Sequence, residues 1–140
     1  MSAFRITLPV LLGFAVQVLA APPAAPVACE VLPAASWSSA VGSTASATPG
    51  DMNCTYQVPG KTGGGQFRIL AVLASKGEAE ASLKRFREHK SKGTHDPALT
   101  VFDSQGSVVF SISLFQDAAT DTSAAQLEKL VAVAKQHLPK

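Results

Sequence analysis

Residues 53–74 read NCTYQVPGKTGGGQFRILAVLA, and this stretch decides the fold. From Asn53 to Val58 apolar and polar side chains alternate strictly, which is typical of a strand with one buried side. Residues 59–65 are rich in glycine and predict a turn. Residues 67–74 are apolar on both sides, with Phe67, Ile69, Ala71 and Leu73 on one side and Leu70 and Val72 on the other. We therefore expect a second strand in the centre of a sheet.

A helix is predicted on each side of this pair of strands. Upstream, residues 33–42 begin with a proline and end with a glycine, as short helices often do, and Trp37 is placed to anchor the helix in the core. Residues 43–50 are predicted to be a loop. Downstream, residues 75–92 begin with a capping box formed by Ser75 and Glu78. The stripe expected to face the core comprises Ala79, Leu83 and Phe86.

The last third of the chain predicts a hairpin and a closing helix. The hairpin pairs residues 99–102 with residues 107–115 around a turn at 103–106, where Gly106 can adopt a positive φ. Its expected buried side chains are Val108, Phe110, Ile112 and Leu114. The helix of residues 123–138 begins with a second capping box at Ser123, and its apolar stripe is Leu127, Leu130, Val131, Ala134 and Leu138.

Together these elements predict an α+β fold in the order helix, two strands, helix, two strands, helix. An antiparallel sheet of about four strands, with the helices mainly on one face, buries all the apolar stripes. The chain of 140 residues allows one domain, which we place at residues 29–140. Residues 21–28 are rich in proline and alanine and are expected to form a flexible tether.

Composition excludes two classes of protein. With 46% hydrophobic and 16% charged residues, the chain is too apolar for a disordered polyelectrolyte. A net charge of +2 is far from the basic excess of a dedicated nucleic-acid-binding protein, and we expect no nucleic-acid partner.

The first twenty residues predict export. One positive charge at Arg5, an uncharged apolar run and a Val18-Leu-Ala20 end are typical of a secretory signal peptide, cleaved after about Ala20. The location would then be periplasmic or secreted. The alternative of a membrane anchor is disfavoured because the apolar run is about 16 residues long, whereas a span needs about 20. We expect no stable membrane insertion after processing.

Cys29 and Cys54 are the two cysteines of the chain. An even pair in a small exported domain more often forms a disulfide than a metal site or a catalytic nucleophile, so a structural bridge is predicted. Lipidation of Cys29 is left open as an alternative, although residues 26–28 lack the leucine usual before a lipidated cysteine.

The domain opens with Cys29 and a short helix ending at Gly42, continues with the Cys54-Thr-Tyr56 strand and closes with Leu138-Pro139. In these features it resembles a widespread group of small bacterial exported proteins and lipoproteins. The resemblance implies a compact α+β sandwich, a location in the bacterial envelope and a Cys29–Cys54 bridge. It implies no catalytic motif, and residues 92–97 depart from the glycine-rich segment common in the group.

Few residues carry catalytic or metal-binding patterns. The Pro59-Gly-Lys-Thr62 segment lacks the first glycine and the following helix of a phosphate-binding loop. His89, His95 and Asp96 are suitable metal ligands, but they lack a recognisable spacing and are only weak candidates. We expect no cofactor and no enzymatic activity.

The clearest charge asymmetry lies in the helix of residues 75–92. Lys84, Arg85, Arg87 and Lys92 near its end are a candidate anion-facing patch, although a simple solvated helix surface would look the same. Three hypotheses follow for function. The first is a non-enzymatic exported domain that binds an unidentified envelope or extracellular protein or an anionic ligand. The second is an inhibitor or immunity-type protein that blocks a secreted enzyme through a loop such as residues 60–65. The third is a small metal-dependent hydrolase.

Overall fold

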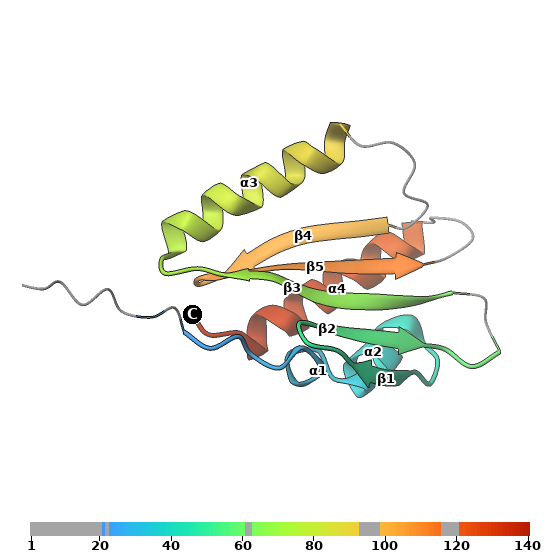
Figure 1. Cartoon of the computed structure of the whole chain (residues 1–140). Helices are drawn as coiled ribbons and strands as arrows, with labels where there is room; N and C mark the ends of the chain where they lie inside the picture. Colours follow the sequence, from blue (N-terminus) through green and yellow to red (C-terminus); the bar gives the residue numbers. More distant parts are fainter. Residues whose placement is uncertain (1–20, 22, 61–62, 93–98, 116–120) are drawn as a thin grey trace, which may run out of the picture.

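The computed structural model describes residues 21, 23–60, 63–92, 99–115 and 121–140, with the backbone alone for 90–92 and 121–123 (Figure 1). The predicted signal peptide therefore lies outside the described residues. The helices are α1 (Ala28–Val31), α2 (Ala34–Val41), α3 (Lys76–Lys92) and α4 (Asp121–His137). The strands are β1 (Ser46–Pro49), β2 (Asn53–Gln57), β3 (Gly64–Val72), β4 (Leu99–Gln105) and β5 (Val108–Phe115).

The strands form one antiparallel sheet in the order β1-β2-β3-β5-β4. The predicted α+β class with an antiparallel sheet is confirmed, and β3 is the central strand, as its apolar composition predicted. Cys54 of β2 lies opposite Phe67 of β3, which in turn lies opposite Ile112 of β5. All three side chains are fully buried and point to the same side of the sheet.

The sheet has five described strands, whereas about four were predicted, because residues predicted as a loop form β1. Ser46–Pro49 is short, polar and largely exposed, so it carries no apolar alternation. Pro49 is tolerated there because β1 is an edge strand, where a missing backbone N–H leaves no ladder bond unmade. The chain also forms a short first helix, α1, that was not predicted, and Ala28 within it is buried.

Two further predictions about strand geometry are wrong. Gly64 and Gly65 belong to β3 and not to the preceding turn. The register of β3 shifts between Ile69 and Ala71, so strict alternation fails at Leu70, and Val72 packs against the same core as Ile69.

The hairpin is tighter than predicted. β4 continues to Gln105, which pairs with Val108, and only Gly106 and Ser107 form the turn. Gly106 adopts a φ of 57°, as expected from its position. The four side chains predicted to be buried in this hairpin, Val108, Phe110, Ile112 and Leu114, are all buried.

The main core lies between the sheet and the layer of α1, α2 and α4. Trp37 of α2 is fully buried and stacks on Tyr56 of β2, with ring centroids 4.3 Å apart and nearly parallel planes. The Tyr56 hydroxyl donates a hydrogen bond to the backbone carbonyl of Leu32, just after α1. The buried part of the predicted α4 stripe comprises Leu127, Leu130, Ala134 and Leu138, and Val131 packs at its border. The α4 helix begins at Asp121, so Ser123 lies inside it and the capping box predicted there is wrong.

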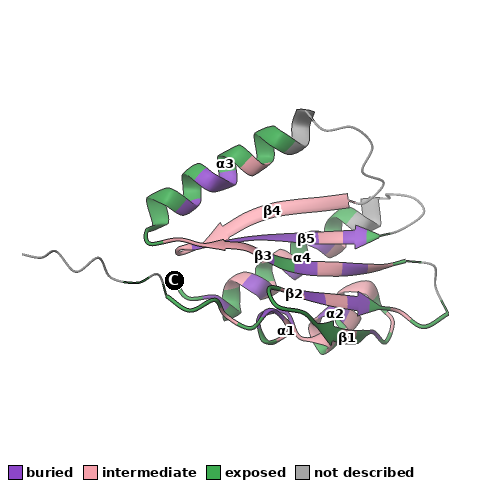
Figure 2. Cartoon of the chain, in the orientation of Figure 1, coloured by how far each residue is buried: buried purple, intermediate pink, exposed green. Residues whose placement is uncertain are grey.

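The α3 helix packs on the opposite side of the sheet, over β4 and β5. It buries Ala79, Ser82 and Leu83, and its Phe86 ring stacks on Phe102 of β4 at 5.9 Å, so the predicted inner stripe is confirmed. The amide of Glu78 donates to the Ser75 hydroxyl at its start, as the capping box predicted. Figure 2 shows that most of α3 is exposed, in contrast to β5. Three helices on one face and α3 on the other agree with the predicted arrangement.

Cys29 and Cys54 form a disulfide, with Cα atoms 5.0 Å apart, which confirms the predicted bridge. The bond joins α1 to β2, so it connects the helical layer to the sheet. In the part of the chain that the structure describes, no helix is both long and apolar enough to cross a bilayer.

Candidate binding face

One side of the sheet is only partly covered by the described residues. The main core fills the side that faces α1, α2 and α4, while on the other side α3 packs against part of β4 and β5 and leaves Ser113 half-buried and Phe115 exposed. We call the uncovered remainder of this second side the open face. By the strand register it carries Ser46, Thr48, Asn53, Thr55, Gln57, Gln66, Arg68, Ser113 and Phe115. Each of these side chains is exposed or half-buried.

A continuous row of neutral polar side chains crosses the open face and continues onto β4. In register from β1 to β4 the row is Thr48, Thr55, Gln66, Ser113 and Thr100. The Ser113 and Thr100 hydroxyls are hydrogen-bonded to each other at 2.8 Å. With strands about 4.8 Å apart, four spacings extend the row over about 19 Å. A flat row of hydroxyl and amide groups can both donate and accept hydrogen bonds along an extended ligand.

An aromatic ring borders this row. Phe115 is 45% exposed at the end of β5, and its cross-strand neighbour on β3 is Gly64. A Cβ at Gly64 would lie 2.3 Å from the Tyr56 carbonyl oxygen, so no side chain fits there without moving backbone. The next residue across the sheet is the exposed Gln57. The Phe115 ring therefore has no cross-strand side chain on β3 beside it.

The charge carried by the open face is positive. Arg68 of β3 is exposed, and the described residues place no carboxylate within ion-pairing distance of it. None of the side chains on this face is an aspartate or a glutamate. A guanidinium with five N–H donors and no carboxylate partner in the described part of the chain is suited to binding a carboxylate, sulfate or phosphate group.

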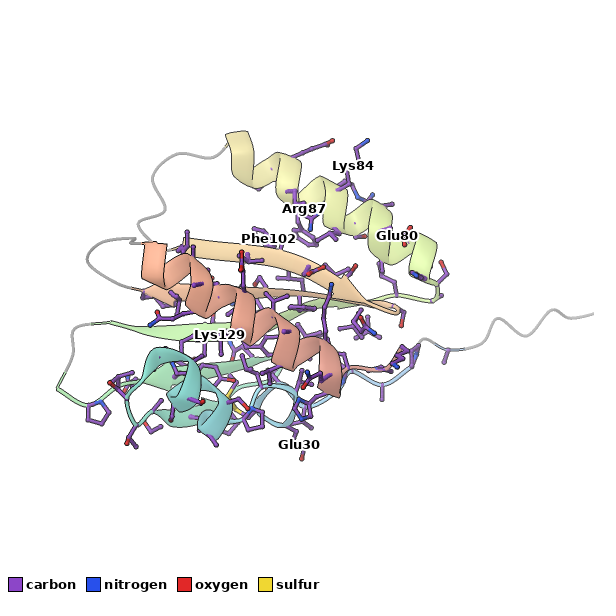
Figure 3. All side chains as sticks on the ribbon, turned by 180° about the vertical axis from the view of Figure 1, so that it is seen from behind. Glu30, Glu80, Lys84, Arg87, Phe102 and Lys129 are labelled. Carbon is purple, nitrogen blue, oxygen red and sulfur yellow. A yellow bond between two sulfur atoms is a disulfide. The ribbon has the colours of Figure 1, made fainter. Side chains whose placement is uncertain are left out.

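The structure places the predicted anion-facing residues on more than one side of α3. Lys84 is 78% exposed, points away from the sheet and lies 3.9 Å from Glu88 (Figure 3). Arg87 turns inward and donates to the backbone carbonyl of Phe102 on the edge strand β4 at 3.3 Å. Arg85 donates to the hydroxyl of the buried Ser82. Lys92 is the last residue of α3, and its side chain lies outside the described residues.

Arg85 is the member of this group that borders the open face. Residues two apart on an α-helix point about 200° apart, so Arg85 lies almost opposite Arg87. Since Arg87 contacts the outer edge of β4, Arg85 lies on the flank of α3 that faces β3. Arg68 and Arg85 thus border the same part of the sheet from two elements.

Of the three candidate metal ligands, the structure describes only one. His89 is exposed on α3, while His95 and Asp96 lie outside the described residues. Among the residues that are described, no group of three or more His, Cys, Asp or Glu side chains could hold a metal ion.

Among the described residues, Tyr56 is the group with a clearly perturbed ionisation, and its role is in packing. Burial raises the pKa of the Tyr56 phenol far above its usual value of about 10. Its hydroxyl already donates to the Leu32 carbonyl, and its ring is covered by Trp37. The phenol therefore stabilises the fold as a neutral hydrogen-bond donor.

A shallow hollow lies on the opposite side of the molecule, between α2 and α4. Its volume is about 380 Å³, it is open to solvent, and it is lined by Ala35, Ser36, Ser39, Ala40, Lys129 and Val133. Figure 3 shows Lys129 on α4 on this side of the molecule. Lys129 is an exposed cation remote from the open face and serves below as a control position.

The sequence singled out none of the open-face residues as a candidate site, Arg68 and Phe115 included. Arg68 lies between the apolar Phe67 and Ile69 in the predicted strand. Since neighbouring side chains of a strand point to opposite sides, the Arg68 side chain is expected to point away from the core. The sequence does not show which strands α3 covers, so the exposure of this side was not predictable.

No protein-family model matches the chain, and comparison with curated proteins and with solved structures gave no match.

Proposed function

We propose that this protein is an exported, non-enzymatic domain that binds a partner or ligand of the cell envelope or the extracellular space through its open face. The observation that carries the proposal is that α3 packs against β4 and β5, and that no described residues cover the same side of β1, β2 and β3. This open face carries hydroxyl and amide side chains, an exposed aromatic ring and an arginine with no carboxylate partner among the described residues.

The rest of the described molecule supports a scaffold role. The Cys29–Cys54 disulfide suits an oxidising compartment, and the apolar run of residues 1–20 is typical of an export signal. The buried side chains of α1, α2 and α4 pack on the sheet and stiffen the strands from behind. A rigid sheet can present the open face with little loss of backbone entropy on binding.

Site-specific photocrosslinking tests this function. Benzoylphenylalanine replaces Gln57 on the open face or, as a matched control, the exposed Gln136 on α4. The full-length gene is expressed in its native host, so that export and processing take place. We expect ultraviolet light to give a discrete adduct from position 57 and none from position 136.

The same preparation tests export. The intact mass of the purified protein is expected to lack residues 1–20 and to be two hydrogens lighter than the dithiol form. Equal adducts from both positions, or none from position 57, would contradict binding through the open face. A protein that keeps residues 1–20 would contradict export with cleavage.

A further inference from the structure

We infer that the ligand of the open face is an extended anionic polysaccharide, a chain of sugar units that carries carboxylate or sulfate groups. This inference rests on the proposed function and names the chemical class of its ligand. It combines three properties of one surface, namely a neutral polar row, an accessible aromatic ring and an arginine for which the described residues provide no carboxylate partner.

The neutral row fits sugar hydroxyls. Thr48, Thr55 and Gln66 lie side by side on three adjacent strands, at a spacing of about 4.8 Å, which is close to the length of one sugar unit in an extended chain. Each side chain both donates and accepts, as a sugar hydroxyl does. Ser113 and Thr100 bond to each other and continue the row toward α3.

The aromatic ring fits the apolar face of a sugar ring. The C–H groups on that face carry a small positive charge and are attracted to the negative face of an aromatic ring. Phe115 is 45% exposed, and Gly64 leaves the space beside it on β3 without a side chain. A protein partner would be better matched by a larger apolar patch, yet Phe115 stands among the polar Gln57, Gln66 and Ser113.

The charge selects an acidic sugar over a neutral one. Arg68 has no carboxylate partner among the described residues, and Arg85 borders the same part of the sheet from α3. No acidic side chain of β1, β2, β3 or β5 lies on this face to repel an anion. A guanidinium binds a carboxylate or sulfate through paired hydrogen bonds, which also fixes the direction of the bound chain.

Binding measurements with defined polymers test the inference on the processed, disulfide-bonded protein. The probes are polygalacturonate, its fully methyl-esterified form, hyaluronate, heparin and poly-L-glutamate. We expect saturable binding to at least one of the three acidic polysaccharides. Methyl-esterified polygalacturonate should bind more weakly than polygalacturonate if the latter binds, and poly-L-glutamate should bind at least about tenfold more weakly than the best polysaccharide.

Matched variants locate the site. Arg68→Gln should weaken binding about tenfold, because one charge-assisted contact is lost. Phe115→Ala should weaken it about fivefold through loss of stacking, with circular dichroism as the check on folding. Lys129→Gln removes the same charge from the opposite side and should change binding less than about twofold.

Four results would overturn the inference. They are no saturable binding to any acidic polysaccharide, equal binding of poly-L-glutamate, equal losses in Arg68→Gln and Lys129→Gln, and unchanged binding in Phe115→Ala. If polysaccharides fail while position 57 still gives a discrete protein adduct, the open face binds a protein and the proposed function stands. If both experiments fail, the proposed function fails as well.

Discussion

At the scale of single residues, the core depends on a missing side chain at Gly65. A Cβ at this position would lie 1.8 Å from Cη2 and 2.0 Å from Cζ2 of Trp37, and 2.8 Å from the Ser113 carbonyl oxygen. The indole has no room to move away from the added methyl group, because it is fully buried and its ring is stacked on Tyr56. The glycine-rich segment thus provides the space that Trp37 occupies, in addition to the turn predicted from its sequence.

We expect Gly65→Ala to lower the free energy of unfolding by about 2–3 kcal/mol, because the added methyl group overpacks the Trp37 site. Gly77→Ala is the matched control. Gly77 lies in the first turn of α3 with open space around its Cα, so alanine should stabilise the protein by up to about 1 kcal/mol. Urea denaturation followed by tryptophan fluorescence measures both. Equal effects of the two substitutions would contradict this account of the Gly65 contact.

Tyr56 gives the protein a predictable sensitivity to alkaline pH. Burial raises the pKa of the phenol in the folded state above its unfolded value of about 10, so the folded state retains a proton that the unfolded state releases. The stabilisation is therefore complete below pH 10 and is lost as pH rises above it. Tyr56 is the only tyrosine of the chain, so the tyrosinate absorbance reports this group alone.

We expect the tyrosinate signal to appear together with unfolding as pH is raised above 10, and not as a separate titration of the folded protein. Tyr56→Phe should lower stability at neutral pH by about 1–3 kcal/mol, because the Leu32 carbonyl loses its buried donor. It should also reduce the fall in stability between neutral and high pH. A tyrosinate titration near pH 10 in protein that remains folded would show that burial does not protect the phenol.

At the scale of elements, sequence periodicity predicted those helices and strands that bury apolar side chains on one side. The alternation around Cys54 and Tyr56 and the stripe of α4 each need only one buried side, and both are confirmed. The β1 strand was missed because its four residues are polar and pair at an edge, so their strand conformation depends on hydrogen bonds to β2. The shift at Leu70 was missed for a related reason, since a bulge is set by the partner strand.

The two long helices are expected to differ in local stability. The α3 helix buries Ala79, Ser82 and Leu83 outside the main core, whereas α4 packs five apolar side chains against the main core, namely the buried Leu127, Leu130 and Ala134 and the partly buried Val131 and Val133. Amide hydrogen exchange should therefore be faster in α3 than in the last three turns of α4. Phe86→Ala removes the stack on Phe102 and should speed exchange in α3 further, without a change in α4. Equal protection of the two helices would contradict this assignment of the weaker element.

At the scale of the whole molecule, the candidate site depends on which part of the sheet α3 covers. The sequence predicted a basic group on α3, and the structure places Arg85 beside the open face and Arg87 against β4. Arg68 and Phe115 come from β3 and β5 and meet the polar row only through the sheet register. The sequence pattern of a strand indicates which of its sides is polar. The uncovered area of the sheet depends on where α3 packs, and the sequence pattern of a single element does not predict that.

The N-terminal segment is attached to the sheet twice, and this predicts a coupling between two bonds. The Cys29–Cys54 disulfide and the Tyr56 hydrogen bond to Leu32 both hold residues 29–32 against the same side of β2. The disulfide closes a loop of about 26 residues and so restricts the unfolded chain. Removing it should lower the free energy of unfolding by about 3.5 kcal/mol. Alanine is the suitable replacement for Cys54, because that side chain is fully buried, and serine is suitable for the half-buried Cys29.

A double-mutant cycle between Tyr56→Phe and the paired Cys29→Ser, Cys54→Ala change measures this coupling. Without the disulfide, the segment holds Leu32 less firmly against Tyr56, so the hydroxyl should contribute less. We expect the combined loss, from urea denaturation, to be smaller than the sum of the separate losses by at least about 0.5 kcal/mol. Gly77→Ala in place of Tyr56→Phe should give additive changes in the free energy of unfolding, a small gain from Gly77→Ala and the full loss from the disulfide, since Gly77 lies in another element. Strict additivity in both cycles would show that each bond holds the segment independently.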